Sequence, residues 1–130
     1  IKCDYFGYFP CTPPIIKKEN YNNFFKEFFK HRKSYDSFNS VSVVKKFLWK
    51  DKKSINYKTY KAPNSQNLPN NFFSLTFGLN VISRAKMIKL KNIVGKKPKF
   101  FPLSKIECAD IDDKVDFDMI KSVFPKFISK

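Results

Sequence analysis

The chain has 130 residues, of which 42% are hydrophobic and 18% aromatic, and it carries a formal net charge of +15. A chain of this length and composition can form one domain with a hydrophobic core, which excludes a disordered tail. The sequence has no run of about 18 apolar residues, so no membrane-spanning helix is predicted. The charge favours a solvated basic surface over a nucleic-acid partner, because lysines are spread along the chain and only Arg32 and Arg84 offer the guanidinium group that base and phosphate recognition prefers.

The first predicted element is a strand over residues 5–9, an apolar run that stops at Pro10. A continuous apolar run of this kind is typical of a strand that is buried on both faces of a parallel sheet. Prolines 10, 13 and 14 then prevent regular hydrogen bonding and predict a turn at the end of the strand. Open α/β sheets bind their ligands at that edge.

A helix is predicted over residues 17–33, followed by a strand over residues 38–44. The helical apolar positions fall at i, i+3, i+4, i+7 and i+8, and they are Tyr21, Phe24, Phe25, Phe28 and Phe29. This spacing indicates an amphipathic helix that lies on a sheet. Strand, helix and strand form a β-α-β unit, whose crossover is expected to be right-handed with its two strands parallel.

A hairpin is predicted around residues 51–54, with Trp49, Ile55 and Tyr57 as strand residues. Apolar residues 47–49 precede its turn. If they are exposed they form an interface, since a large exposed apolar patch usually marks one, and the alternative is packing within the chain.

The second half of the chain is predicted to contain a polar loop over residues 58–71, a strand over residues 72–82, a short helix capped by Ser83 and a strand over residues 99–102. Gly78 lies within the long strand, where glycine often marks the close approach of a backbone or a ligand. A closing helix carries Phe117, Ile120, Val123 and Phe124 on one face and is expected to end at Pro125.

Residues 107–118 hold six of the chain's 11 acidic side chains, namely Glu107, Asp110, Asp112, Asp113, Asp116 and Asp118. If residues 106–112 are extended, Asp110 and Asp112 share one face while Ile111 points into a core. Two carboxylates on one face suit Mg²⁺, which binds one or two carboxylates together with the phosphates of a substrate. The alternative is that Asp112 or Asp113 caps a helix beginning near residue 114, which leaves Asp110 without a role.

Three stretches resemble motifs of the acylneuraminate cytidylyltransferases, in the same order along the chain. Residues 109–117, Ala-Asp-Ile-Asp-Asp-Lys-Val-Asp-Phe, are similar to the family's Asp-Ile-Asp-Thr-x-x-Asp-Phe signature. Residues 9–15 resemble its Pro-Thr-Ser-Pro-Leu turn, and residues 64–69 resemble its Arg-x-Gln-x-Leu-Pro loop. These enzymes activate sialic acid and related nonulosonic acids with CTP.

The resemblance implies a partial nucleotide-diphospho-sugar transferase-like, Rossmann-like fold: a mixed sheet with flanking helices and a dimerisation hairpin. Residues 1–130 would be one partial domain, and residues 45–75 an insertion that reaches a second subunit of a homodimer. Asp110 and Asp112 would bind Mg²⁺, and Gln66, Thr76 and Gly78 would contact the sugar acid. The products would be a CMP-sugar and pyrophosphate.

The chain departs from the family in three places. It has no counterpart of the N-terminal glycine-containing basic loop that grips CTP, so it reads as a C-terminal fragment that is inactive alone. Phe9 stands where the family often has a polar substrate contact, and Asn64 stands at the start of the loop where the family has arginine. A catalytically inert dimerising remnant is therefore the alternative function, and a basic nucleic-acid binder is a more distant one.

The cysteines and the single histidine indicate no separate site. The cysteines are Cys3, Cys11 and Cys108, an odd and widely spaced set without a metal-ligand pattern, which favours reduced thiols and a cytoplasmic location. His31 follows a helical lysine and is expected at the surface.

Overall fold

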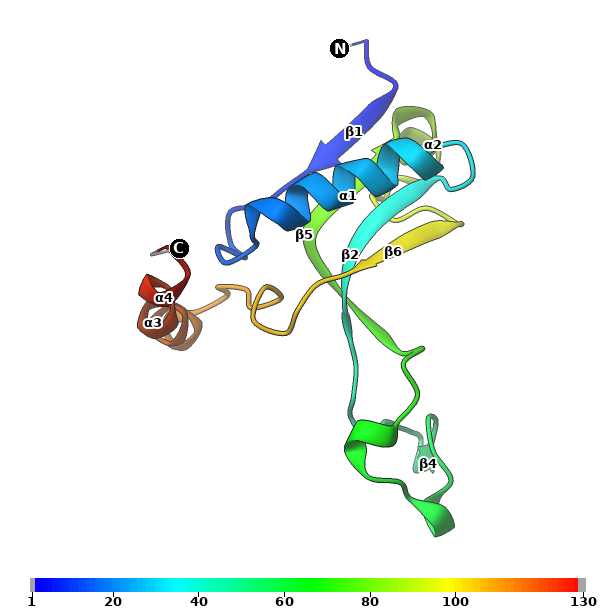
Figure 1. Cartoon of the computed structure of the whole chain (residues 1–130). Coiled ribbons are helices and arrows are strands. Elements are labelled where there is room, and N and C mark those ends of the chain that lie inside the picture. The colour runs from blue at the N-terminus through cyan, green and yellow to red at the C-terminus, as the bar shows by residue number, and fades with distance from the viewer. Residues whose placement is uncertain (1, 129–130) are drawn as a thin grey trace.

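A computed structural model describes residues 2–128 as a mixed α/β structure in which one long helix lies on a four-stranded sheet (Figure 1). The helix, α1 (Lys18–His31), places Phe24 and Phe28 against the strands, where both are buried. The stripe of aromatic residues is wider than this contact, so Phe29 remains 61% exposed and the guanidinium group of Arg32 lies over its ring. The predicted amphipathic helix is confirmed.

The sheet has the strand order β1-β5-β2-β6, formed by β1 (Tyr5–Tyr8), β5 (Phe73–Ser83), β2 (Ser37–Val43) and β6 (Pro98–Pro102). Strand β5 runs antiparallel to both β1 and β2, whereas β2 and β6 are parallel. β1 and β2 therefore point the same way, as expected, but β5 lies between them. Together with its flanking helices this gives the mixed sheet that the resemblance implies, whereas the parallel sheet expected from the apolar run of β1 is not formed.

The prediction that β1 is buried on both faces is wrong. β1 is an edge strand, and α1 covers only one face of it, where the ring of Tyr5 packs edge-on against Phe28 with 4.9 Å between centroids. Side chains alternate between the faces of a strand, so Phe6 and Tyr8 point away from α1 and are 37% and 45% exposed. An apolar run alone does not tell an edge strand from a central one.

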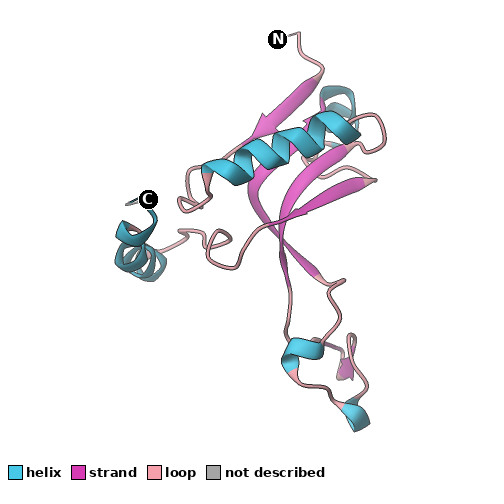
Figure 2. Cartoon of the chain, in the orientation of Figure 1, coloured by secondary structure: helices cyan, strands magenta, loops and turns pink. Residues whose placement is uncertain are grey.

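An arm, residues 44–72, connects β2 to β5 and extends away from the sheet (Figures 1 and 2). It contains the predicted hairpin, β3 (Trp49–Lys50) and β4 (Lys53–Ser54), and two short 3-10 helices, η1 (Thr59–Lys61) and η2 (Ser65–Asn67). Buried Asn56 ties the arm together, because its side chain accepts a hydrogen bond from Leu48 N and donates one to Lys46 O.

Three further helices complete the described chain. Ser83 caps α2 (Arg84–Leu90), as predicted, by accepting a hydrogen bond from Lys86 N. The closing helix α3 (Lys114–Val123) ends where expected, but Pro125 then begins a further short helix, α4 (Pro125–Ile128). Proline fits there because its fixed φ suits the first turn of a helix. No helix within residues 2–128 is long and apolar enough to cross a membrane.

Candidate functional site

Glu107 has a structural role in the acidic segment. It is 2% exposed and accepts hydrogen bonds from Lys17 N (3.1 Å), from the Asn20 side chain (2.6 Å) and from Ser104. Since Lys17 provides no side-chain cap for α1, Glu107 supplies an acceptor for the start of that helix from 90 residues away. Burial by itself raises the pKa of Glu107, but the hydrogen bonds from Ser104, Lys17 and Asn20 outweigh it and lower the pKa below its usual 4.5.

Three more carboxylates of the segment serve helix α3. Asp113 accepts hydrogen bonds from Val115 N (2.8 Å) and Asp116 N (3.0 Å), so it is the N-cap, one of the two residues the sequence offered for that role. Asp116 lies in the first turn and accepts from the backbone of Asp112 (3.2 Å). Asp118 forms an ion pair with Lys114 one turn earlier.

Asp110 and Asp112 are the two acidic side chains that remain. Within residues 2–128 the Asp112 carboxylate has no hydrogen bond or ion pair, and Asp110 accepts only from Ile111 N (3.1 Å), the amide next to it. The segment is not the expected strand, since a turn over residues 105–108 leads into irregular backbone. The expected alternation nevertheless holds, because both carboxylates line one cavity while Ile111 lines an apolar pocket with Phe117.

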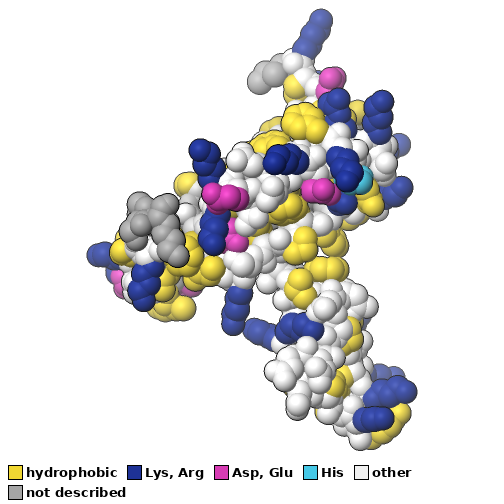
Figure 3. All heavy atoms as spheres, viewed as in Figure 1, with side chains coloured by type: hydrophobic (Ala, Val, Ile, Leu, Met, Phe, Trp, Pro, Cys, Tyr) yellow, Lys and Arg dark blue, Asp and Glu magenta, His cyan; other side chains and the backbone are white. Residues whose placement is uncertain are grey.

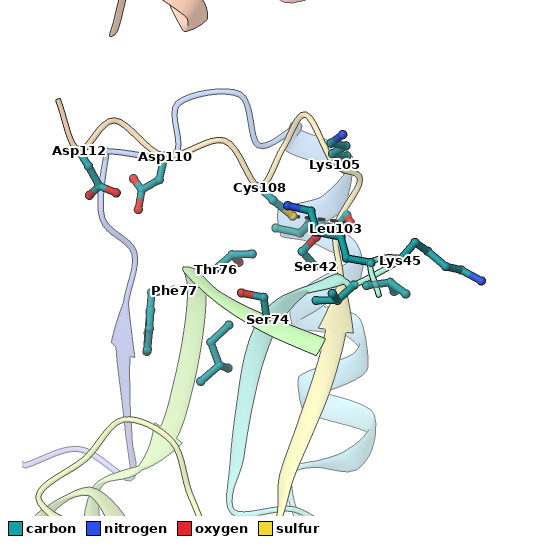
Figure 4. Close-up of a pocket in the computed structure, with 14 residues that line it drawn as sticks. Ser42, Lys45, Ser74, Thr76, Phe77, Leu103, Lys105, Cys108, Asp110 and Asp112 are labelled. Atoms are coloured by element: carbon teal, nitrogen blue, oxygen red, sulfur yellow. Dashed lines mark hydrogen bonds between the residues drawn. The ribbon is translucent and has the colours of Figure 1, made fainter. Parts of the chain in front are cut away.

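The cavity has a volume of about 810 Å³ and lies between the acidic segment and the ends of β2 and β5. Figure 4 shows Asp110 and Asp112 together on the loop that faces the bend of β5, where Thr76 and Phe77 lie. Figure 4 shows Ser42, Lys45 and Lys105 toward the opposite end, and Lys46 and Ser74 also line the cavity. The site therefore has an acidic end and a basic end.

Cys108 lines the cavity between these two ends. Burial raises the pKa of its thiol, a hydrogen bond with Ser42 opposes the rise, and the negative charge of Glu107 adds to it. A thiol with a raised pKa stays protonated at neutral pH and is a weak nucleophile. Cys108 is thus a residue that lines the cavity.

The predicted site residues divide into two groups. Asp110, Asp112 and Thr76 line the same cavity, although they are separated in sequence. Gln66 lies in η2 of the arm, is exposed and does not line the cavity. Gly78 is buried beneath the cavity, where an added Cβ would lie 2.6 Å from the Ile16 side chain, so its close neighbour is a core side chain.

Neither the basic end of the cavity nor the role of Phe77 has a clear signal in the sequence. Lysines 45, 46 and 105 are indistinguishable in sequence from the many solvated lysines, which cover the visible face without forming one patch (Figure 3). Phe77 follows Thr76 in a strand pattern that predicts no unusual backbone. Only the neighbouring Gly78 marked this part of β5 as irregular.

The donors at the acidic end fit a hard cation. Carboxylate oxygens are the ligands that Mg²⁺ prefers, and two of them leave coordination positions for water and for the phosphates of a substrate. Residues 2–128 contain no group of three or more acidic, histidine or cysteine side chains arranged for a metal.

Comparisons of the sequence with protein-family models and with curated proteins found no match. Function must therefore be inferred from the cavity and from residues 109–117, the resembling stretch that lines it.

Proposed function

We propose that this chain is the C-terminal part of a cytidylyltransferase that activates a nonulosonic, sialic-type acid with CTP. The observation that carries the proposal is the availability of Asp110 and Asp112. Four of the six clustered carboxylates have structural partners, and the remaining two face a cavity that Thr76 also lines. Asp110 and Asp112 belong to the stretch that resembles the cytidylyltransferase signature, and Thr76 is a residue that the resemblance implies would contact the sugar acid.

In this reaction the anomeric hydroxyl of the sugar acid attacks the α-phosphate of CTP, and pyrophosphate leaves. Asp110 and Asp112 would hold Mg²⁺, which when bound offsets the negative charge of the phosphates. Lysines at the opposite end of the cavity would attract the carboxylate of the sugar acid. Both ends act by positioning and electrostatics, which dominate phosphoryl and nucleotidyl transfer.

The chain alone is expected to be inactive. Its only glycines are Gly7, Gly78 and Gly95, and none lies in a basic, glycine-rich loop that could bring backbone amides to a triphosphate. The nucleotide-binding part would come from a segment outside these 130 residues. The proposal also implies a cytoplasmic location, where Cys3, Cys11 and Cys108 would stay reduced.

A second candidate function is a dimerising module without catalysis. The arm favours it, because Phe47, Trp49 and Ile55 are 43%, 54% and 48% exposed on a segment that extends from the sheet. A homodimer formed through the arm is compatible with either function.

Thermal unfolding in the presence of ligands separates the two candidates. The wild-type chain and an Asp110→Ala, Asp112→Ala double variant would be melted with N-acetylneuraminic acid, CTP and magnesium chloride, each alone and together. A ligand that binds the native state stabilises it by mass action and so raises Tm. At a ligand concentration a hundredfold above Kd, the free energy of unfolding increases by about 2.7 kcal/mol. We expect a rise for the wild type that the double variant loses.

The matched control is Glu19→Ala, Asp118→Ala, which removes the same charge from two helices and leaves the cavity intact. This control should retain the rise in Tm. If the wild type shows no rise in Tm, Asp110 and Asp112 do not form a working metal site in this chain. The dimerising module then becomes the better assignment.

A further inference from the structure

Strand β5 contains a large bulge at the cavity. Its pairing with β2 matches Asn39 with Asn80 and then Val41 with Leu75, so residues 76–79 of β5 all lie opposite the single residue Ser40. Bulges re-aim side chains and are enriched next to functional sites. This one displaces Thr76 and Phe77 from the regular ladder.

Buried polar side chains stabilise the bulge. The hydroxyl of Ser40, which is fully buried, lies 2.7 Å from the Thr76 hydroxyl and accepts a hydrogen bond from Leu79 N (2.9 Å). The side-chain amide of Asn80, 1% exposed, donates to the carbonyl oxygens of Phe77 and Tyr8. These bonds span both ends of the bulge, so they define its conformation.

Phe77 has an unfavourable backbone conformation in this bulge. Its φ is +52°, in the left-handed region, where a bulky side chain crowds the backbone and glycine or asparagine is usual. The ring is nevertheless 42% exposed, and within residues 2–128 it stacks on no other ring or cation. Core packing therefore does not account for an aromatic residue here.

Phe77 instead lines the cavity together with Thr76, at the bend of β5 that faces the loop of Asp110 and Asp112 (Figure 4). We infer that Phe77 is a specificity-determining contact, whose ring packs against the apolar C–H face of a ring-shaped ligand bound in the cavity. Backbone strain that neighbouring groups maintain often accompanies a binding role. That the ligand is a sugar acid rests on the proposed function, whereas the aromatic contact does not.

Three substitutions separate the ring from the backbone. Phe77→Ala and Phe77→Gly both remove the ring, but only glycine relieves the left-handed backbone. We expect both to bind ligand at least about fivefold more weakly than the wild type, by the same factor. The Gly variant should melt about 2 to 4 °C higher than the Ala variant. Phe77→Tyr keeps the ring and should keep the affinity.

Binding would be measured by calorimetry with N-acetylneuraminic acid plus magnesium chloride and, separately, with CMP plus magnesium chloride. The control is Phe73→Ala, which removes a 41% exposed ring from the same strand outside the cavity and should leave both affinities unchanged. Loss of sugar-acid binding in both the Ala and Gly variants supports the contact.

The remaining outcomes distinguish the contact from the proposed function. Equal affinity of the wild type and both ring-free variants for the sugar acid overturns the contact and leaves the proposed function standing. Binding of CMP but not of the sugar acid, with the same dependence on the ring, supports the contact and contradicts the sugar-acid assignment. If affinity follows Tm, so that Phe77→Gly binds ligand better than Phe77→Ala, Phe77 is a structural residue. If neither probe binds the wild type, both proposals are overturned.

Discussion

Glu107 links the start of helix α1 to the acidic segment that carries the candidate site. Its carboxylate accepts hydrogen bonds from Lys17 N and Asn20 on one side and from Ser104 on the other. A buried carboxylate is tolerated only when such donors surround it. Because Asp110 follows Glu107 by three residues, this link also restricts where the loop that carries Asp110 can lie.

Replacing Glu107 with alanine should destabilise the fold strongly. The substitution leaves Lys17 N, the Asn20 amide and Ser104 without their acceptor, and we expect a loss of roughly 2 to 4 kcal/mol in the free energy of unfolding, measured by urea denaturation. Exposed Glu19 on the same helix is the control, and Glu19→Ala should cost less than about 1 kcal/mol. Similar losses for both variants would contradict the role given to Glu107.

The lowered pKa of Glu107 predicts how this contribution changes with pH. A carboxyl with a lowered pKa in the folded state stabilises the protein fully above its unfolded value, here near 4.5, and the stabilisation disappears as pH falls through the folded pKa. The difference in Tm between the wild type and Glu107→Gln should therefore be largest at neutral pH and narrow below 4.5. A constant difference down to about pH 3 would contradict the lowered pKa.

At the level of elements, the hairpin of the arm has an unusual turn. Asp51 and Lys52 both have positive φ, +49° and +63°, which is the conformation of a type I′ turn. Such turns match the twist of a two-stranded ribbon but favour Asn-Gly over these two residues. The hairpin is therefore less stable than its geometry allows.

Asp51→Asn combined with Lys52→Gly should stabilise this hairpin locally. We expect a gain of about 1 kcal/mol, seen as roughly fivefold slower hydrogen exchange of Ile55 N, which donates to Leu48 O across the hairpin. The amide of Leu103, which donates to Val41 O at the sheet, is the internal control and should exchange at an unchanged rate. Faster exchange at Ile55 would show that the native turn residues are already the better choice.

Elements with a local signal could be predicted from the sequence. The aromatic stripe gave α1, the turn around Asp51 gave the hairpin, and Ser83 and Asp113 marked the starts of α2 and α3. In each case the signal and the element lie within a few residues of one another. Asp110 and Asp112 line one cavity, but the strand from which their common face was predicted is not formed.

Features that depend on distant partners could not be predicted. The bulge at Phe77 needs Ser40 and Asn80 from the sheet, and a left-handed phenylalanine has no sequence signature. The edge position of β1 depends on strand order, which the sequence of β1 does not contain. The partners of Glu107 at the start of α1 lie about 90 residues away, so the sequence presented it as one more acid in a cluster.

At the scale of the whole molecule, the net charge of +15 opposes contact between copies. Lys and Arg side chains cover both the sheet region and the end of the arm in the view of Figure 3. Salt screens the repulsion between like-charged copies, and at 0.1 M salt the screening length is about 10 Å. Salt should therefore favour apolar self-association, whereas it weakens binding to nucleic acid through counterion competition.

If the arm mediates a homodimer, self-association should strengthen as salt is added. Trp49 is the only tryptophan and is 54% exposed in the arm, so burial at an interface should shift its emission to shorter wavelength as protein concentration rises. Ile55→Asp, which places a charge on the arm, should abolish the shift and leave a monomer by analytical ultracentrifugation. Ile88→Asp, on α2 and 55% exposed, introduces the same charge away from the arm and should leave the dimer intact. Association that both variants retain, or that salt dissolves, would exclude the arm as an apolar dimer interface.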